Sequence, residues 1–206
     1  MARKRVYLIR HGRTPGNALR KYIGRGTDEA LSPEGMEEAE RCRRLIDSMQ
    51  DFHQDALRVC ASPMTRAMQT AGILFDSPVT AIRALEEMDF GLFEGKEEKE
   101  LSKLSSWQSW VDGGCMGQVP GGENLDGFID RSYAGFLEAL GDRALDETIV
   151  IVCHGGTIMA ILSRLTGEAY FTFMTRNLCG YRLDLETEDE SIHLVSYDRF
   201  GGGDPA

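Results

Sequence analysis

The sequence of 206 residues has no apolar run that approaches the roughly 20 residues needed to cross a membrane. After the basic start at residues 2–5, the apolar stretch at residues 6–9 is too short for the core of a signal peptide. Positive charge is also scarce, because 23 Lys and Arg face 33 Asp and Glu and the net charge is −10. Nucleic-acid-binding proteins are usually basic. We therefore expect a cytoplasmic protein whose partner is neither a membrane nor a nucleic acid.

Cysteine, tryptophan and histidine are few. The five cysteines are odd in number and never spaced as Cys-x-x-Cys, which argues against structural zinc and a disulfide framework and favours a reducing compartment. Two of them, Cys60 and Cys153, stand in apolar runs, where a free cysteine acts as a small hydrophobic residue. The two tryptophans, Trp107 and Trp110, are expected to form the core of a small subregion. Of the four histidines, His53 and His193 lie in no motif and are expected to be structural or surface residues.

Short strand-like runs alternate with longer helical patterns along the chain. Strands are expected at residues 6–9, 57–61, 78–82, 148–153, 181–185 and 192–197. Ser32 before Pro33 is typical of a helix start, and Ser62 before Pro63 repeats the device. The alternation predicts an α/β fold with three layers, α/β/α, around a mostly parallel central sheet. The length favours one domain over residues 1–200, with a subregion inserted at about 96–122 and a disordered tail at 201–206.

Three of the expected strands end in residues that suit the binding of a phosphoryl group. The first runs into Arg10 and His11, the second into Ser62 with Arg66 one turn into the next helix, and a late one into His154. The carboxyl ends of parallel strands meet at one edge of a sheet, so these residues should converge. Arginine matches phosphate oxygens, the two helix N-termini nearby would offer free N–H groups, and a neutral histidine can act as a nucleophile.

Five segments resemble the histidine phosphatase superfamily, the phosphoglycerate-mutase-like proteins, and they occur in that family's order. They are residues 8–14 (LIRHGRT, with Asn17 after it), 61–71 (ASPMTRAMQTA), 85–95 (LEEMDFGLFEG), 120–123 (PGGE) and 152–157 (VCHGGT). An Arg-His-Gly tripeptide alone would be weak evidence, whereas five ordered motifs across residues 5–197 are specific. The resemblance implies a phosphoglycerate-mutase-like fold and an enzyme for small phosphate esters that needs no cofactor or metal. Whether the chain is a monomer or a homodimer stays open.

The same resemblance implies a role for each matching residue. His11 would be the nucleophile that becomes phosphorylated, while Arg10, Arg66 and His154 would hold the phosphoryl oxygens and stabilise the transition state. Glu87, rather than the adjacent Glu86, would protonate the leaving oxygen and then activate water. Lesser contacts with the substrate are expected from Asn17, Ser62, Gly155, Arg13 and Gly24.

Arg13 and Glu94 differ from the other residues of the five motifs. Arg13 departs from the family pattern, because many members carry an acidic residue there; its charge would lie at the rim of the pocket and favour more anionic substrates. Glu94, although it closes the acidic motif, is assigned with Glu97, Glu98 and Glu100 to a solvated face.

Other functions remain as alternatives. His11, His154 and Glu87 could in principle ligate a metal, although two arginines at the same place would repel a cation. A non-catalytic phosphate-binding module would keep the arginines but has no need of the acid. Within the family, mutases tend to carry a longer insertion, and only 67 positions separate Glu87 from His154, which favours hydrolysis. Residues 22–32 are similar to the matching loop of alpha-ribazole phosphatases, and broad-specificity and fructose-bisphosphatase-like members share much of it. Alpha-ribazole 5′-phosphate is therefore the leading substrate.

Overall fold

The computed structural model describes residues 2–52, 57–141, 147–188 and 191–201, and the six strands within these ranges form one sheet. Their order is β3-β2-β4-β1-β5-β6; the pairs among the first four are parallel, while β5 and β6 add antiparallel pairs at one side. The mixed, mostly parallel sheet of the predicted fold is confirmed. The strands are β1 (Ala2–Arg10), β2 (Leu57–Ala61), β3 (Val79–Ala81), β4 (Glu147–Cys153), β5 (Gly180–Glu188) and β6 (Ser191–Phe200).

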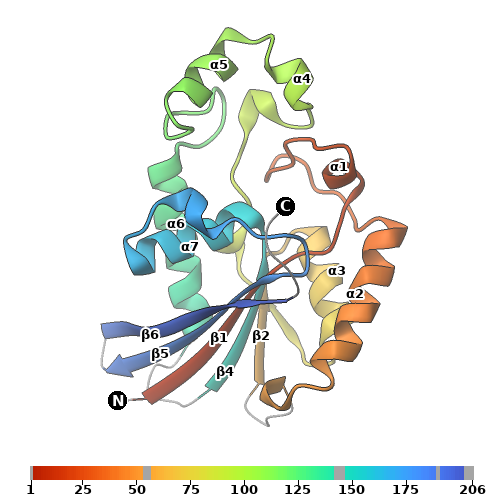
Figure 1. Cartoon of the computed structure of the whole chain (residues 1–206), viewed down its shortest axis with the longest axis vertical. Coiled ribbons are helices and arrows are strands. Elements are labelled where there is room, and N and C mark those ends of the chain that lie inside the picture. The colour runs from red at the N-terminus through yellow and green to blue at the C-terminus, as the bar shows by residue number, and fades with distance from the viewer. Residues whose placement is uncertain (1, 53–56, 142–146, 189–190, 202–206) are drawn as a thin grey trace.

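Helices cover both faces of the sheet, as Figure 1 shows. One face packs against α2 and α3, and the other against α6 and α7. The short helices α1, α4 and α5 lie beyond the carboxyl ends of the parallel strands (Figure 1). The helices are α1 (Pro15–Ala18), α2 (Pro33–Ile46), α3 (Thr65–Leu74), α4 (Glu98–Leu101), α5 (Ser105–Asp112), α6 (Leu125–Leu140) and α7 (Gly155–Thr166).

The apolar runs of the central strands are buried on both sides of the sheet. In β1, Val6 and Leu8 join the core under α6 and α7, whereas Tyr7 and Ile9 join the core under α2 and α3. This division follows from the two-residue period of a strand, which sends successive side chains to opposite faces. Continuous apolar runs are therefore typical of strands with helices on both faces. Cys60 and Cys153 both lie in the core under α6 and α7, as their apolar sequence context predicted.

One predicted helix start is confirmed and the other is wrong. Ser32 caps α2, because its hydroxyl accepts a hydrogen bond from the Gly35 N–H at 3.0 Å. The helix after Ser62 begins only at Thr65, because Ser62 directly follows β2 and its hydroxyl faces His154. The N-terminus of α3 is capped from another loop: Asp28 accepts from both the N–H (2.8 Å) and the hydroxyl (2.8 Å) of Thr65.

The predicted inserted subregion contains α4 and α5. Trp107 and Trp110 are buried there, 5% and 8% exposed, in an apolar cluster that also holds Phe93 and Leu101. The predicted role of the tryptophans as the core of this part is thus confirmed.

Several remaining expectations concern the periphery. His193 lies exposed on β6, as predicted, whereas His53 and residues 202–206 of the predicted tail fall outside the described residues. Within the described residues, no helix combines the length and the apolar character that a membrane span requires.

Candidate active site

The carboxyl ends of three parallel strands bring the predicted site residues together. Arg10 at the end of β1 pairs with Cys153 of β4, and Ala61 of β2 pairs with Val152, so the residues that follow share one edge of the sheet. The rings of His11 and His154 lie there with their centroids 5.2 Å apart. The convergence predicted from strand topology is therefore observed.

The ring of His11 is held in one tautomer. Its Nδ1 lies 2.7 Å from the carbonyl oxygen of Gly12, which can only accept, so Nδ1 carries the proton and Nε2 keeps its lone pair. The imidazole is only 4% exposed. Burial first, and then the charges of Arg10 and Arg66, hold the pKa of His11 well below its usual range. The ring is therefore neutral, as a nucleophilic histidine must be.

His154 is neutral by the same physical causes and is fixed at both nitrogens. Burial, followed by the Arg66 charge, lowers the pKa of His154 well below its usual range. Its Nδ1 accepts from Arg66 Nε at 3.2 Å, so Nε2 carries the proton and donates to the Ser62 hydroxyl at 2.8 Å. His154 thus orients Arg66 and Ser62. Its predicted contact with a phosphoryl oxygen stays a prediction.

The two arginines offer buried donors at this edge. Arg66 is 1% exposed, and it donates through Nη1 to Thr27 O (3.0 Å) and through Nη2 to Gly24 O (3.1 Å), besides its bond to His154. Two of its five N–H groups have no partner in the part of the chain that the structure describes, and could donate to a ligand. Arg10 donates to Thr175 O at 2.8 Å, while its buried Nε has no partner among the described residues. A buried donor without a partner costs free energy that a phosphoryl oxygen would recover.

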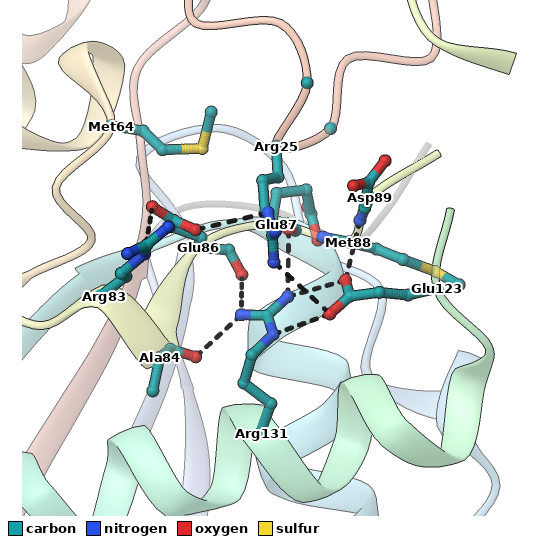
Figure 2. A network of polar contacts seen from close by, with 12 residues as sticks. Arg25, Met64, Arg83, Ala84, Glu86, Glu87, Met88, Asp89, Glu123 and Arg131 are labelled. Atoms are coloured by element: carbon teal, nitrogen blue, oxygen red, sulfur yellow. Dashed lines mark hydrogen bonds and ion pairs between the residues drawn. The ribbon is translucent and has the colours of Figure 1, made fainter. Parts of the chain in front are cut away.

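The carboxyl group of Glu87 lies buried at the same edge, 8% exposed. It accepts hydrogen bonds from Met88 N (2.9 Å) and from Gly156 N (3.0 Å) at the start of α7. Burial raises its pKa despite these donors and the nearby arginines. A carboxylic acid with a raised pKa keeps its proton closer to neutral pH, which suits a general acid. The adjacent Glu86 instead points to Arg25, 3.6 Å away, as Figure 2 shows.

Other predicted contacts occupy different places around this edge. Asn17 accepts from Thr14 N (3.3 Å) and from Asn177 Nδ2 (3.2 Å), and it lines a cleft of about 900 Å³ together with Arg10 and Arg13. The side chain of Arg13 is 51% exposed and lies 3.6 Å from Glu38. Gly155 sits against Arg10, since a Cβ there would lie 3.5 Å from the guanidinium carbon. The carbonyl of Gly24 accepts a hydrogen bond from Arg66 Nη2, so the role that the structure shows for Gly24 is to hold the Arg66 side chain.

The sequence interpretation of Glu94 is wrong. Its carboxylate accepts from Gly24 N (3.0 Å), Gly26 N (3.0 Å), the Thr27 hydroxyl (2.9 Å) and Phe90 N (3.2 Å). It therefore fastens the loop whose carbonyls hold Arg66. Its place within the acidic motif could have indicated this role. Its grouping with Glu97, Glu98 and Glu100, which follow it closely in the sequence, instead favoured a solvated face.

Sequence reasoning missed Asn177 and Thr70. Asn177 donates to the His11 carbonyl at 2.8 Å from the segment before β5, which has no motif. Thr70 accepts from Gly12 N (2.9 Å) and donates to Arg66 O (2.7 Å). It therefore links the motif at residues 8–14 to the motif at residues 61–71. Its position one turn after Arg66 on α3 was the only hint. The described residues contain no group of three or more His, Cys, Asp and Glu that could hold a metal ion.

Comparison with known proteins identifies the family of this chain. A model of the histidine phosphatase superfamily (branch 1) matches residues 6–198, and the chain belongs to that family. The chain is 31% identical to phosphoglycerate mutase-like protein 4 of Arabidopsis thaliana, over 80% of this chain and 72% of the relative. It is 25% identical to the adenosylcobalamin/alpha-ribazole phosphatase of Escherichia coli, over 96% and 98%. The crystal structure of the alpha-ribazole phosphatase from Shigella flexneri superposes with a TM-score of 0.75 at 25% identity, covering 92% of this chain and 94% of that one.

Proposed function

We propose that this chain hydrolyses phosphate monoesters of small metabolites through a phosphohistidine at His11. The observation that supports this most strongly is the state of His11, whose Nδ1 proton is held by Gly12 O beside the buried Arg66 and the partly buried Arg10. Nε2 attacks phosphorus, and the bond from phosphorus to the ester oxygen breaks as Glu87 gives that oxygen its proton. Water then loses a proton to Glu87 and attacks phosphorus, the P–N bond breaks, and inorganic phosphate leaves. Arg10 and Arg66 supply the positive charge that phosphoryl transfer requires.

Alpha-ribazole 5′-phosphate is the leading substrate. Two observations support it: the similarity of residues 22–32 to the loop of alpha-ribazole phosphatases, and a relative of that name that matches almost the whole chain. The structure adds that this loop lies at the site, because its carbonyls at Gly24 and Thr27 hold Arg66.

The test is phosphate release from alpha-ribazole phosphate, 3-phosphoglycerate, fructose bisphosphates and p-nitrophenyl phosphate in excess EDTA. We expect release from the wild type, none from His11→Ala, and the highest kcat/KM on alpha-ribazole phosphate. Arg13→Glu on the same panel should lower the relative rate on bisphosphates. Interconversion of 2- and 3-phosphoglycerate without phosphate release would identify a mutase. Binding of phosphate without turnover of any ester would identify a non-catalytic module.

A further inference from the structure

The main chain that carries Glu87 is held by one arginine of a neighbouring helix. Arg131 of α6 donates through Nη1 to the carbonyls of Ala84 (3.0 Å) and Glu86 (3.0 Å), and through Nη2 to that of Glu87 (3.3 Å). Figure 2 shows these bonds meeting at one guanidinium group beneath the segment. The guanidinium group is planar and rigid. Its contact with three carbonyls therefore fixes both the position of residues 84–87 relative to α6 and the rotation of their backbone.

The other side of the same segment is held by Glu123, which forms a bidentate pair with Arg131. The two hydrogen bonds measure 2.9 Å (Nε to Oε1) and 2.8 Å (Nη2 to Oε2). Glu123 Oε2 also accepts from Asp89 N at 2.9 Å, and Glu123 N donates to Asp89 O at 3.0 Å. Glu87 therefore lies between two anchored stretches of backbone that share one ion pair.

This attachment leaves no room for a larger residue at the turn before Glu123. A Cβ on Gly122 would lie 2.2 Å from Asp89 O, and Gly91, at φ +44°, would meet Pro120 O at 2.4 Å. Leu92 N donates to Pro120 O at 2.9 Å. The PGGE motif at residues 120–123 thus packs directly against the backbone of residues 89–92, which follow Glu87.

The pair stays charged but adds no net charge to the site. Burial would raise the pKa of Glu123, yet its bonds to Arg131 and Asp89 N outweigh burial and hold that pKa below its usual range. Hydrogen bonds from charged groups are the strong ones, and the bidentate form adds geometric specificity. Every hydrogen bond of the Arg131 side chain within the described residues goes to Glu123 or to the carbonyls of residues 84–87.

We propose that Arg131 and Glu123 are positioning residues for Glu87, placing its carboxyl group for proton transfer to the leaving oxygen without sharing in phosphate binding. This inference rests on the proposed function, in which Glu87 is the general acid. A misplaced acid slows the cleavage of esters with basic leaving oxygens. It affects p-nitrophenyl phosphate much less, because that leaving group departs with little protonation.

The experiment measures kcat/KM, which reports the phosphorylation step, across aryl and alkyl phosphates of increasing leaving-group pKa. Arg131→Met and Glu123→Gln are compared with wild type, with Glu87→Gln as the reference for loss of the acid. Arg83→Met is the matched control, because the Arg83 side chain lies 4.0 Å from Glu86 but is 86% exposed. Within the described residues, this side chain forms no hydrogen bond with the main chain of residues 84–87. We expect about 100-fold losses on alkyl phosphates in both positioning variants, since a shift near 1 Å can cost that much, and a few-fold loss at most on p-nitrophenyl phosphate.

Each outcome decides the inference. Equal losses on all esters in Arg131→Met and Glu123→Gln, with the steep dependence present in Glu87→Gln, would show a merely structural role and overturn it. A flat profile in Glu87→Gln itself would remove the acid assignment of the proposed function, and the positioning role with it. A steep profile in Arg83→Met would show that any disturbance near Glu86 has this effect, and would also overturn it. Glu123→Gln keeps the side-chain volume and an acceptor for Asp89 N, so the test survives if Arg131→Met does not fold.

Discussion

At the scale of single residues, the proposed reaction depends on the protonation states of His11 and Glu87. His11 must lack a proton on Nε2 to attack, and Glu87 must hold one to give to the ester oxygen. The fold favours both states: burial and two arginines lower the pKa of His11, while burial raises the pKa of Glu87. Two groups whose environments push their pKa values in opposite directions are typical of acid–base catalysis.

These shifts predict the pH dependence of kcat/KM on an alkyl phosphate. Activity should fall as pH rises through the pKa of Glu87, which lies above the ordinary carboxyl value of about 4.3. On the acid side it should persist below the ordinary histidine value of about 6.5, because His11 protonates only at lower pH. The measurement is a pH–rate profile of wild type and Glu87→Gln. Ionisation of the substrate is common to both, so a basic limb that is unchanged in Glu87→Gln would contradict the assignment.

At the scale of the elements, the loop between α1 and α2 acts as the support of Arg66. Gly24 has no room for a side chain there, because a Cβ would lie 2.0 Å from Met88 O, a backbone atom that cannot move aside cheaply. Gly24→Ala should therefore displace the carbonyl that holds Arg66 Nη2 and raise KM about 10-fold or more, within the range that small misplacements produce.

The matched control is Gly72→Ala in the last turn of α3. A Cβ there meets nothing within 4 Å, so alanine should raise the free energy of unfolding by about 1 kcal/mol and leave activity unchanged. Urea unfolding and steady-state kinetics of both variants check the pair. An unchanged KM in Gly24→Ala would show that the loop does not position Arg66.

Strand topology predicted where the strand-borne parts of the site lie, whereas the loop-borne Glu87 was found only through its motif and other loop residues were not found at all. The positions of His11, Ser62 and His154 follow from apolar runs and from the rule that parallel strands end at one edge. Asn177 could not be found, because its bond to the His11 carbonyl depends on how the chain enters an antiparallel strand. The prediction that Ser62 caps a helix was wrong because a Ser-Pro pair can also follow a strand, and the sequence alone does not distinguish the two cases.

For the whole molecule, the net charge of −10 contrasts with the positive charge that Arg10 and Arg66 bring to the site. Arg10 and Arg66 are held there largely by neutral carbonyls and a neutral histidine, so a bound anion should stabilise the fold. Orthovanadate or inorganic phosphate at 100 times its Kd should add about 2.7 kcal/mol to the free energy of unfolding.

Thermal unfolding with and without the anion measures this effect, at constant ionic strength set with chloride. At this chain length we expect a rise in Tm of about 5–10 °C for the wild type. Arg66→Met should gain far less, because the fork that receives the oxygens is gone. An equal gain in both proteins would place the anion elsewhere.

The position of β1 in the sheet also shapes how the molecule is made. β1 is translated before the other five strands, yet its two neighbours are β4 and β5, whose registers join Arg10 to Cys153 and Ala2 to Thr187. The strand that carries the apolar run at residues 6–9 therefore stays unpaired on both edges until β4 and β5 have been synthesised. Such distant pairings slow folding and leave nascent chains open to aggregation. The nucleophile is thus translated before Arg66, Glu87 and His154, and the strand that precedes it gains its two neighbours only after Arg66 and Glu87 have been made and, for β5, after His154 as well.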